Sequence, residues 1–419
     1  MLWLLAGWRI DLLEIGGSSV RVEDLIILAL LPTGYRGFRN SRWRQVSRAF
    51  VWLVAASIAS VVFGVLSERV EFATAILFGS RPLEYSVVLF AALELAGRPG
   101  GRAAAFRVLV AVTVAQSIAT ALGLVGLLNV SFSKFSGERA AGLTAGPYEL
   151  GAMAAALVIY WAIESRPLML GMSLFMLFAS ASRASLFAVI VVVTLLVIAS
   201  VFSRSQAPRF SRRIQTVVGL SAILGALGMG LIASGVGDQS AIFTRITSTD
   251  VVQSWRDAES VTSSDRELPT SQDYRAFAFG DTGTAFDNLP NTDASTFVRF
   301  VRWQTLLYRQ FREIDAVFFG LGPSFAGPSV DGSLLRTFVE IGFVGSAVWV
   351  AIYVNLLKQS CRMGIMVLGT YFVGSLFIDL MSAMRPTLLI YFILGVAAVH
   401  APPSGGKDLR QSRLGRATR

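Results

Sequence analysis

The sequence predicts an all-α, polytopic membrane protein, and three observations support this prediction. Of the 419 residues, 54% are hydrophobic and only 15% are charged, whereas soluble domains are about 45–50% apolar and about 25% charged. The apolar residues gather in repeated runs close to the roughly 20 residues that a helix needs to cross a bilayer. The basic residues lie mostly in short loops between these runs. Since backbone polar groups must be satisfied internally in lipid, runs of this kind are expected to be transmembrane helices.

Two short apolar runs come first. Met1–Leu13 is interrupted by charged residues and is either a span or an interfacial helix, and Leu25–Tyr35 crosses only if it is tilted or packed inside a bundle. Ten clearer runs follow: Phe50–Leu66, Leu83–Ala96, Ala105–Leu128, Pro147–Ile163, Leu168–Ala179, Ala184–Phe202, Ile214–Ser234, Ser333–Leu357, Met363–Leu380 and Thr387–Val399. The sequence therefore predicts eleven or twelve spans, about nine of them within residues 1–235 and three within 333–401.

The basic residues predict the side of the membrane on which each loop lies. Arginines cluster at Arg36–Arg48, Arg98–Arg107 and Arg204–Arg213, and the tail 402–419 is also basic. Cytoplasmic loops of membrane proteins are enriched in Lys and Arg, so these segments and the C-terminus are expected to be cytoplasmic. The formal net charge of +10 then reflects topology, and no nucleic-acid partner is expected.

Residues 236–332 are the one long polar segment and are expected to form a large extracytoplasmic loop. From Gly235 to Asp331 the sequence has thirteen Asp or Glu, eight Arg and no Lys. An amphipathic helix is predicted near 294–315, with a lid role, packed on the membrane helices by an aromatic stripe. At 100° per residue the stripe consists of Phe300, Trp303, Leu307 and Phe311, and another face carries Arg302, Arg309 and Arg312.

Several arginines stand at the predicted outer ends of spans, against the positive-inside trend. Arg183 lies in a small-residue turn, Arg139 precedes Gly146-Pro147, and Arg385 lies at the last outer turn. A guanidinium binds phosphate oxygens in a bidentate manner and stays charged at any physiological pH. These arginines therefore predict an anionic ligand such as a lipid-linked pyrophosphate. The alternative is that they extend toward lipid headgroups.

The chain has one histidine, His400, and one cysteine, Cys361. A disulfide within the chain is excluded, and a carboxylate becomes the natural candidate for a general base. Asp331, beside Gly332 and Ser333 at the start of a span, is either a helix cap or a base that accepts a proton from a sugar hydroxyl. No metal and no cofactor are expected.

Three segments, in this order and spacing, resemble the O-antigen ligase/polymerase superfamily of bacterial envelope glycosyltransferases. The first is Arg139-Ala-Ala-Gly142 followed by Pro147, and the second is Ser182-Arg183-Ala184-Ser185-Leu186. The third runs from Arg302-Trp303 through Gly320-Leu-Gly322 and Asp331-Gly-Ser-Leu-Leu335-Arg336 to Glu340-Ile-Gly342-x-x-Gly345. The resemblance covers roughly Ser131 to Val350.

The resemblance implies a metal-independent transferase with a GT-C-type membrane fold. It would lie in the bacterial cytoplasmic (inner) membrane with an extracytoplasmic active site. Its donor would be a glycan on undecaprenyl pyrophosphate. Arg183 would hold the pyrophosphate as a catalytic group, with Arg139 and Arg302 assisting, and Asp331 would sit at the acceptor. Arg299, Arg336 and Tyr148 complete the candidate substrate-binding set.

One motif position separates two branches of this superfamily. Ligases that join O-antigen to lipid A-core typically show His-Asn where this chain has Asp331-Gly332, which favours a polymerase. Donor and acceptor would then both be undecaprenyl-pyrophosphate-linked oligosaccharides for O-antigen, capsule or exopolysaccharide, and a chain-length regulator would be a further partner. A ligase and a lipid-linked sugar transporter or flippase are the alternatives. Transporters usually carry inverted repeats and polar sites near the bilayer midplane, and neither pattern is clear here.

Overall fold

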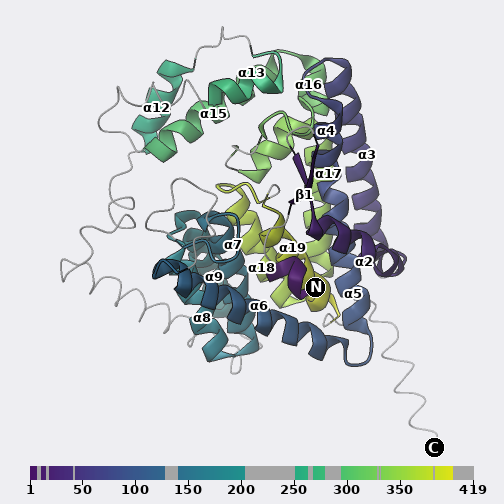
Figure 1. Cartoon of the computed structure of the whole chain (residues 1–419), viewed down its shortest axis with the longest axis vertical. Helices are drawn as coiled ribbons and strands as arrows, with labels where there is room; N and C mark the ends of the chain where they lie inside the picture. The colour runs from purple at the N-terminus through teal and green to yellow at the C-terminus, as the bar shows by residue number, and fades with distance from the viewer. Residues whose placement is uncertain are drawn as a thin grey trace, which may run out of the picture.

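A computed structural model describes residues 1–6, 11–15, 18–40, 43–127, 140–202, 251–262, 268–278, 294–327, 330, 332–380 and 383–399. Within these ranges nearly all regular structure is helical (Figure 1). The exception there is an antiparallel hairpin of two short strands, β1 (Asp11–Ile15) and β2 (Ser18–Arg21). The predicted helical class is confirmed, with this hairpin as an unpredicted addition.

Four helices are long and apolar enough to cross a membrane. They are α3 (Arg44–Leu66), the continuous helix Phe72–Gly97, α6 (Gly101–Leu124) and α17 (Ser333–Gln359). The second of these comprises α4 (Phe72–Gly79) and α5 (Arg81–Gly97). The other helices of the bundle are α2 (Val22–Phe38), α7 (Pro147–Glu164), α8 (Pro167–Ala179), α9 (Arg183–Phe202), α18 (Arg362–Ser375) and α19 (Met384–Ala398). The chain is therefore a polytopic membrane protein.

The N-terminal stretch Met1–Leu13 is not a span. Its helix, α1 (Leu2–Ala6), has five residues, and β1 begins at Asp11. A helix of that length rises only ~7.5 Å, far short of a hydrocarbon core of ~30 Å. The first of the twelve predicted runs is therefore not a transmembrane span. The run Ile214–Ser234 lies outside the described residues.

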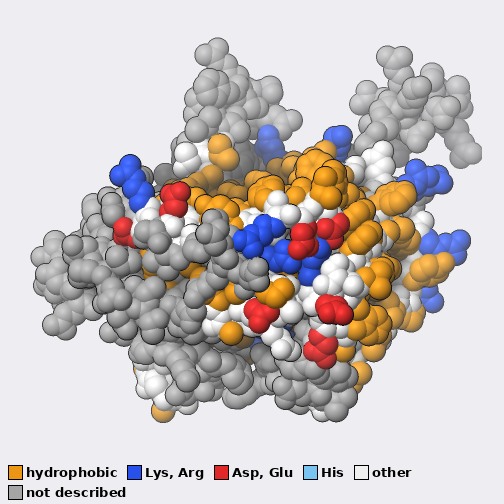
Figure 2. All heavy atoms as spheres, turned by 90° about the horizontal axis from the view of Figure 1, so that it is seen from above, with side chains coloured by type: hydrophobic (Ala, Val, Ile, Leu, Met, Phe, Trp, Pro, Cys, Tyr) orange, Lys and Arg blue, Asp and Glu red, His pale blue; other side chains and the backbone are white. Residues whose placement is uncertain are grey.

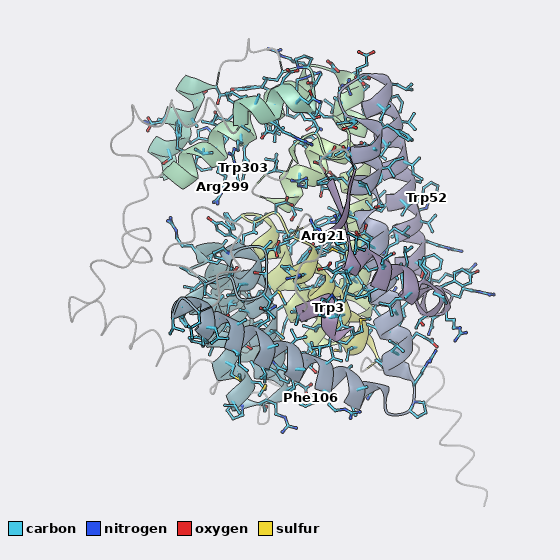
Figure 3. All side chains as sticks on the ribbon, viewed as in Figure 1. Trp3, Arg21, Trp52, Phe106, Arg299 and Trp303 are labelled. Carbon is cyan, nitrogen blue, oxygen red and sulfur yellow. The ribbon has the colours of Figure 1, made fainter. Side chains whose placement is uncertain are left out.

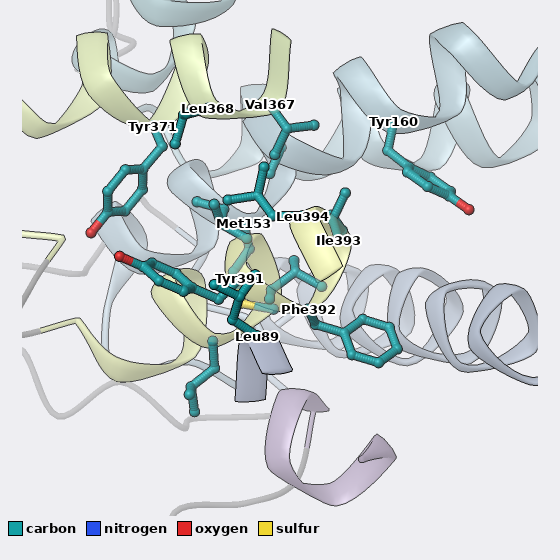
Figure 4. Close-up of a cluster of buried hydrophobic side chains, with 14 of the residues drawn as sticks. Leu89, Met153, Tyr160, Val367, Leu368, Tyr371, Tyr391, Phe392, Ile393 and Leu394 are labelled. Carbon is teal, nitrogen blue, oxygen red and sulfur yellow. The ribbon is translucent and has the colours of Figure 1, made fainter. Parts of the chain in front are cut away.

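The last helix of the chain lies at the centre of the bundle. Every residue of α19 is buried, and α19 packs against α5, α7 and α18. Figure 4 shows side chains from these helices meeting in one cluster, including Leu89, Met153, Leu368 and Phe392. The N-terminal helices therefore need the C-terminal helix in order to bury their apolar faces.

The described part of the polar segment forms a second, smaller layer, which we call the cap. It consists of α12 (Val251–Val261), α13 (Ser271–Ala276), α15 (Ala294–Phe311) and α16 (Ile314–Phe319). The cap helices lie together at one end of the molecule, beyond the ends of α7 and α9 (Figure 1). They share a hydrophobic core with α3, the α3–α4 turn and α4. The core includes Val61, Val70 and Ala75 from that part of the chain, and Phe297, Val301, Leu321 and Phe325 from the cap and the turn after it. The polar segment is thus packed on the membrane helices.

The predicted aromatic stripe is not the most buried face of α15. Phe311 is 62% exposed, whereas Phe297, Val301 and Leu306 are fully buried. Gln310 is also buried, because its Nε2 donates to the carbonyls of Ala316 and Phe338. The prediction missed this face because its apolar residues are interspersed with polar ones, Gln304, Thr305 and Gln310, which are buried in the folded cap.

A glycine contact joins α16 to α17 at the point where α17 bends. Gly342 has φ 67° and ψ −169° inside this candidate span, a backbone conformation that favours glycine. The break frees carbonyls of α17, and these are satisfied by Leu321 N–H to Val339 O at 2.7 Å and Ser60 Oγ to Glu340 O at 2.5 Å. A Cβ on Gly342 would overlap the carbonyl oxygen of Phe318. Gly320 and Gly342 therefore allow the end of α16 to approach the break in α17 closely, since a Cβ on either residue would overlap backbone atoms of the other helix.

We expect Gly342→Ala to destabilise the protein by at least about 2 kcal/mol, because it adds both backbone strain and a steric clash. The measurement is thermal unfolding of the purified protein in detergent. Gly171→Ala is the matched control, since Gly171 lies in α8 with no heavy atom within 4 Å of its added Cβ. Equal melting temperatures for the two variants would contradict the proposed contact.

Candidate functional site

The helix ends that were predicted to be extracytoplasmic meet at the end of the bundle nearest the cap. The Ala140 N–H donates to Ala179 O at 3.0 Å, and the Ser333 N–H donates to Ile378 O at 3.3 Å. Phe187 of α9 packs edge to face on Phe377, which follows α18, with ring centroids 5.8 Å apart. The starts of α7, α9 and α17 and the turn 376–380 are therefore parts of one surface.

The turn between α8 and α9 is shaped by small side chains. Ala181 has a left-handed backbone with φ 49°, and the Ser182 and Ser185 hydroxyls lie 2.9 Å apart. A Cβ on Gly151 of α7 would collide with Ser182. Small residues thus bring the first turn of α7 against the first turn of α9.

Two of the predicted site residues lie in the first turns of these two packed helices. Tyr148 follows the first residue of α7 and is 37% exposed, and Arg183 is the first residue of α9. Both helices begin here, and the dipole of a helix favours an anion near its N-terminus. The α7–α9 end therefore combines a guanidinium, a phenol and two helix N-termini.

Two further candidates come from α15 in the cap. Figure 3 shows Arg299 and Trp303 on the side of α15 that faces the α7–α9 end. Trp303 lies near the start of α17, since its Cζ2 is 3.4 Å from the position that a Cβ on Gly332 would occupy. Arg302 is directed within the cap instead, where its Nη2 donates to Ala278 O at 2.6 Å. Arg299, and not Arg302, is therefore the cap arginine that faces this end.

Arg336 lies beneath this surface in a buried ion network. Its Nε is 2.6 Å from Asp379 Oδ2, its Nη1 is 2.8 Å from Glu340 Oε1, and its Nη2 donates to Gly327 O. The arginine is only 3% exposed. All three nitrogens of Arg336 are engaged by protein atoms, so this residue connects α17, the turn 376–380 and the turn before Asp331.

Two further arginines have ion-pair partners within the protein. Arg385 was among the arginines predicted to meet an anionic ligand, whereas Arg81 was not predicted as a site residue. Arg385 pairs with Glu23 at 3.0 Å and also donates to Leu143 O, which ties α19 to α2 and to the segment before α7. Arg81 pairs with Glu84 at 3.3 Å and lines a small cavity with Arg336. Both arginines lie at the edge of an apolar run in the sequence. Burying a charge at such a position is costly unless the charge has a partner, so the sequence position itself indicates an ion pair.

A third ion network fastens the cap to α3. Arg69, in the turn after α3, pairs with Glu313 and with Asp315 at 2.7 Å, and Arg309 pairs with Glu313 at 2.7 Å. Seen from the cap end (Figure 2), basic and acidic side chains gather side by side among hydrophobic ones. The described part of the cap is therefore held by charges as well as by its core.

Two predicted site residues, Arg139 and Asp331, lie outside the described residues. The described neighbours of Asp331 in the chain are Val330, which is buried, and Gly332, whose φ is 116°.

No protein-family model matches this chain, and no curated protein matches it in sequence. A function is therefore argued from the residues, their arrangement and the motif resemblance.

Proposed function

We propose that this protein is a membrane glycosyltransferase of the GT-C type that polymerises undecaprenyl-pyrophosphate-linked oligosaccharides. The observation that supports it best is the α7–α9 end, where Tyr148 and Arg183 lie in the first turns of two helices that pack together, on the side that Arg299 of the cap faces. A pyrophosphate leaving group needs fixed positive charge where its negative charge develops. Guanidinium groups and helix N-termini supply that charge without a metal.

In the proposed reaction, a hydroxyl oxygen of the acceptor sugar attacks the anomeric carbon of the donor glycan. The bond from that carbon to the pyrophosphate oxygen breaks, and its electron pair leaves with undecaprenyl pyrophosphate. Arg183 binds the departing pyrophosphate, with Arg299 and Tyr148 as further contacts. Asp331 accepts the acceptor proton as general base. Arg336 acts by positioning, because its ion pairs fix the turn before Asp331 relative to α17.

Two contacts agree with the predicted grouping of the loops at two ends of the bundle. The Arg102 guanidinium donates to Val399 O at 2.8 Å, and Arg166 lies over the ring of Phe106 at 5.4 Å. Both contacts join segments that the basic loops predict to be cytoplasmic, whereas Arg183 and the cap share the other end. We propose that the cap and the site face outward from the bacterial inner membrane, with about eleven spans holding them there.

The test is an in vitro reaction of the purified protein with lipid-linked oligosaccharide alone, in the presence of EDTA. A ladder of lengthened glycans is expected. Transfer only after lipid A-core is added would instead identify a ligase. No glycan transfer with either acceptor would remove the glycosyltransferase proposal.

A transporter of lipid-linked sugar is the second candidate, and one observation favours it. α17 is broken at Gly342 within a candidate span, and broken helices often form transporter sites. Here the freed carbonyls accept hydrogen bonds from Leu321 and Ser60, so the break has a structural role. Movement of a fluorescent lipid-linked oligosaccharide across vesicles by a protein that makes no ladder would support transport.

A further inference from the structure

A polar cavity lies between the cap and the turn that joins α3 to α4, and the proposed chemistry does not use it. Its volume is about 390 Å³, within the range of about 300–1,000 Å³ typical of ligand pockets. The lining polar residues come from the α3–α4 segment and from α13 with the residue before it: Glu68, Arg69, Glu71, Thr74, Thr270, Ser271, Gln272 and Arg275. Most of the lining is thus able to form hydrogen bonds.

This lining carries charged groups of both signs. Its guanidinium groups belong to Arg69 and Arg275 and its carboxylates to Glu68 and Glu71, and hydroxyl and amide groups make up the remaining polar residues. An anionic ligand would meet the two carboxylates, and a cation would meet the two guanidinium groups. A neutral polyhydroxylated ligand uses both kinds of group, because each hydroxyl donates one hydrogen bond and accepts others. The lining chemistry therefore favours a neutral sugar.

Arg69 is a buried and fixed part of this lining. Its side chain is 4% exposed, and its Nη2 is held by Glu313 and by Asp315 at 2.7 Å. Its Nη1 is buried and has no hydrogen-bond partner among the described residues. A buried donor without a partner costs free energy, and the ion pairs prevent the guanidinium from turning away. The guanidinium of Arg69 therefore forms a fixed wall of the cavity.

Glu68 contributes a second unusual feature. Its backbone is left-handed, with φ 56°, a conformation that glycine adopts far more readily than glutamate. Glycine at this position would relieve the strain but would remove a carboxylate from the cavity. Strained backbone of this kind is often found at ligand sites.

We propose that this cavity binds a neutral sugar unit of the glycan, as a subsite for the acceptor or the growing chain. The inference rests on the proposed glycosyltransferase function and adds a second contact point to it. Two links connect the cavity to the site: Arg69 is bonded to Glu313 just beyond α15, and Arg275 Nη2 donates to Ser324 O at 3.1 Å in the turn before Asp331. A sugar held here would align its chain with the cap.

The test uses the full-length purified protein and a lipid-free probe. The probe is the repeat-unit oligosaccharide that mild acid releases from the lipid-linked pool of the cells that make this protein. Binding is measured by titration calorimetry for wild type, Glu68→Gly and Gln272→Ala, with Glu259→Gln on α12 as the matched control. We expect each cavity variant to weaken binding about tenfold or more, since hydrogen bonds to charged or fixed groups are lost.

The Glu68→Gly variant separates binding from folding, because it removes backbone strain and should keep the wild-type melting temperature. Arg183→Ala should bind this probe like wild type, since the probe carries no phosphate. Equal binding by wild type and both cavity variants, or competition by inorganic pyrophosphate for the same cavity, would overturn the inference. A wild-type protein that binds the probe in this cavity but forms no glycan ladder would support the sugar subsite and remove the polymerase proposal.

Discussion

Arg183→Ala should abolish glycan polymerisation while leaving the fold intact. If Arg183 stabilises the pyrophosphate as the glycosidic bond breaks, its loss should raise the barrier by about 3 kcal/mol or more, which is a rate decrease of about 100-fold or more. The measurement is the initial rate of ladder formation from lipid-linked oligosaccharide. Arg183→Lys should recover part of the rate, because it keeps a positive charge but loses the bidentate geometry.

Arg256→Ala is the matched control, since Arg256 is an exposed arginine on α12 that has no role in the proposed reaction. It should polymerise like wild type. An Arg183→Ala protein with a wild-type melting temperature and a wild-type rate would exclude Arg183 from catalysis and remove the main argument for the site.

Arg336→Met should produce the largest loss of stability. The change leaves the carboxylates of Asp379 and Glu340 buried without their cation, and removing one partner of a buried ion pair typically costs about 3–5 kcal/mol. The measurement is the melting temperature of the purified protein in detergent. Activity should fall with it, because the turn before Asp331 loses one of its anchors.

The control for this prediction restores charge balance. Combining Arg336→Met with Glu340→Gln and Asp379→Asn should recover much of the lost stability, since no buried charge is then left unpaired. If Arg336→Met instead melts like wild type and shows only weaker substrate binding, Arg336 contacts substrate directly and the positioning role is wrong.

The helices of the bundle were largely predictable, because long apolar runs leave few alternatives in lipid. The run Pro147–Ile163 became α7 (Pro147–Glu164), and Ala184–Phe202 became α9 (Arg183–Phe202). The run Met363–Leu380 was too long: α18 ends at Ser375, and Asp379 lies in the turn that follows. Hydropathy alone could not identify that end, because the turn residues Leu376–Ile378 are themselves apolar.

The site was predictable only in part. The small-residue turn before α9 suggested Arg183 as a site residue. The groups that each arginine contacts, however, depend on ion pairs between segments far apart in the sequence, which the sequence does not reveal. Arg336 was predicted to bind substrate and is instead held by Asp379, 43 positions away in the sequence. Arg69 had no motif, and its role follows from Glu313 and Asp315, which reach it only in the folded cap.

The most direct measurement of the central claim is photo-crosslinking with a lipid-linked oligosaccharide that carries a diazirine beside the pyrophosphate. After irradiation, the crosslinked peptides are identified by mass spectrometry. The account predicts labelling at the α7–α9 end and on α15, in peptides containing Tyr148, Arg183 or Arg299. Labelling confined to the opposite end of the bundle, around Arg102 and Val399, would contradict it.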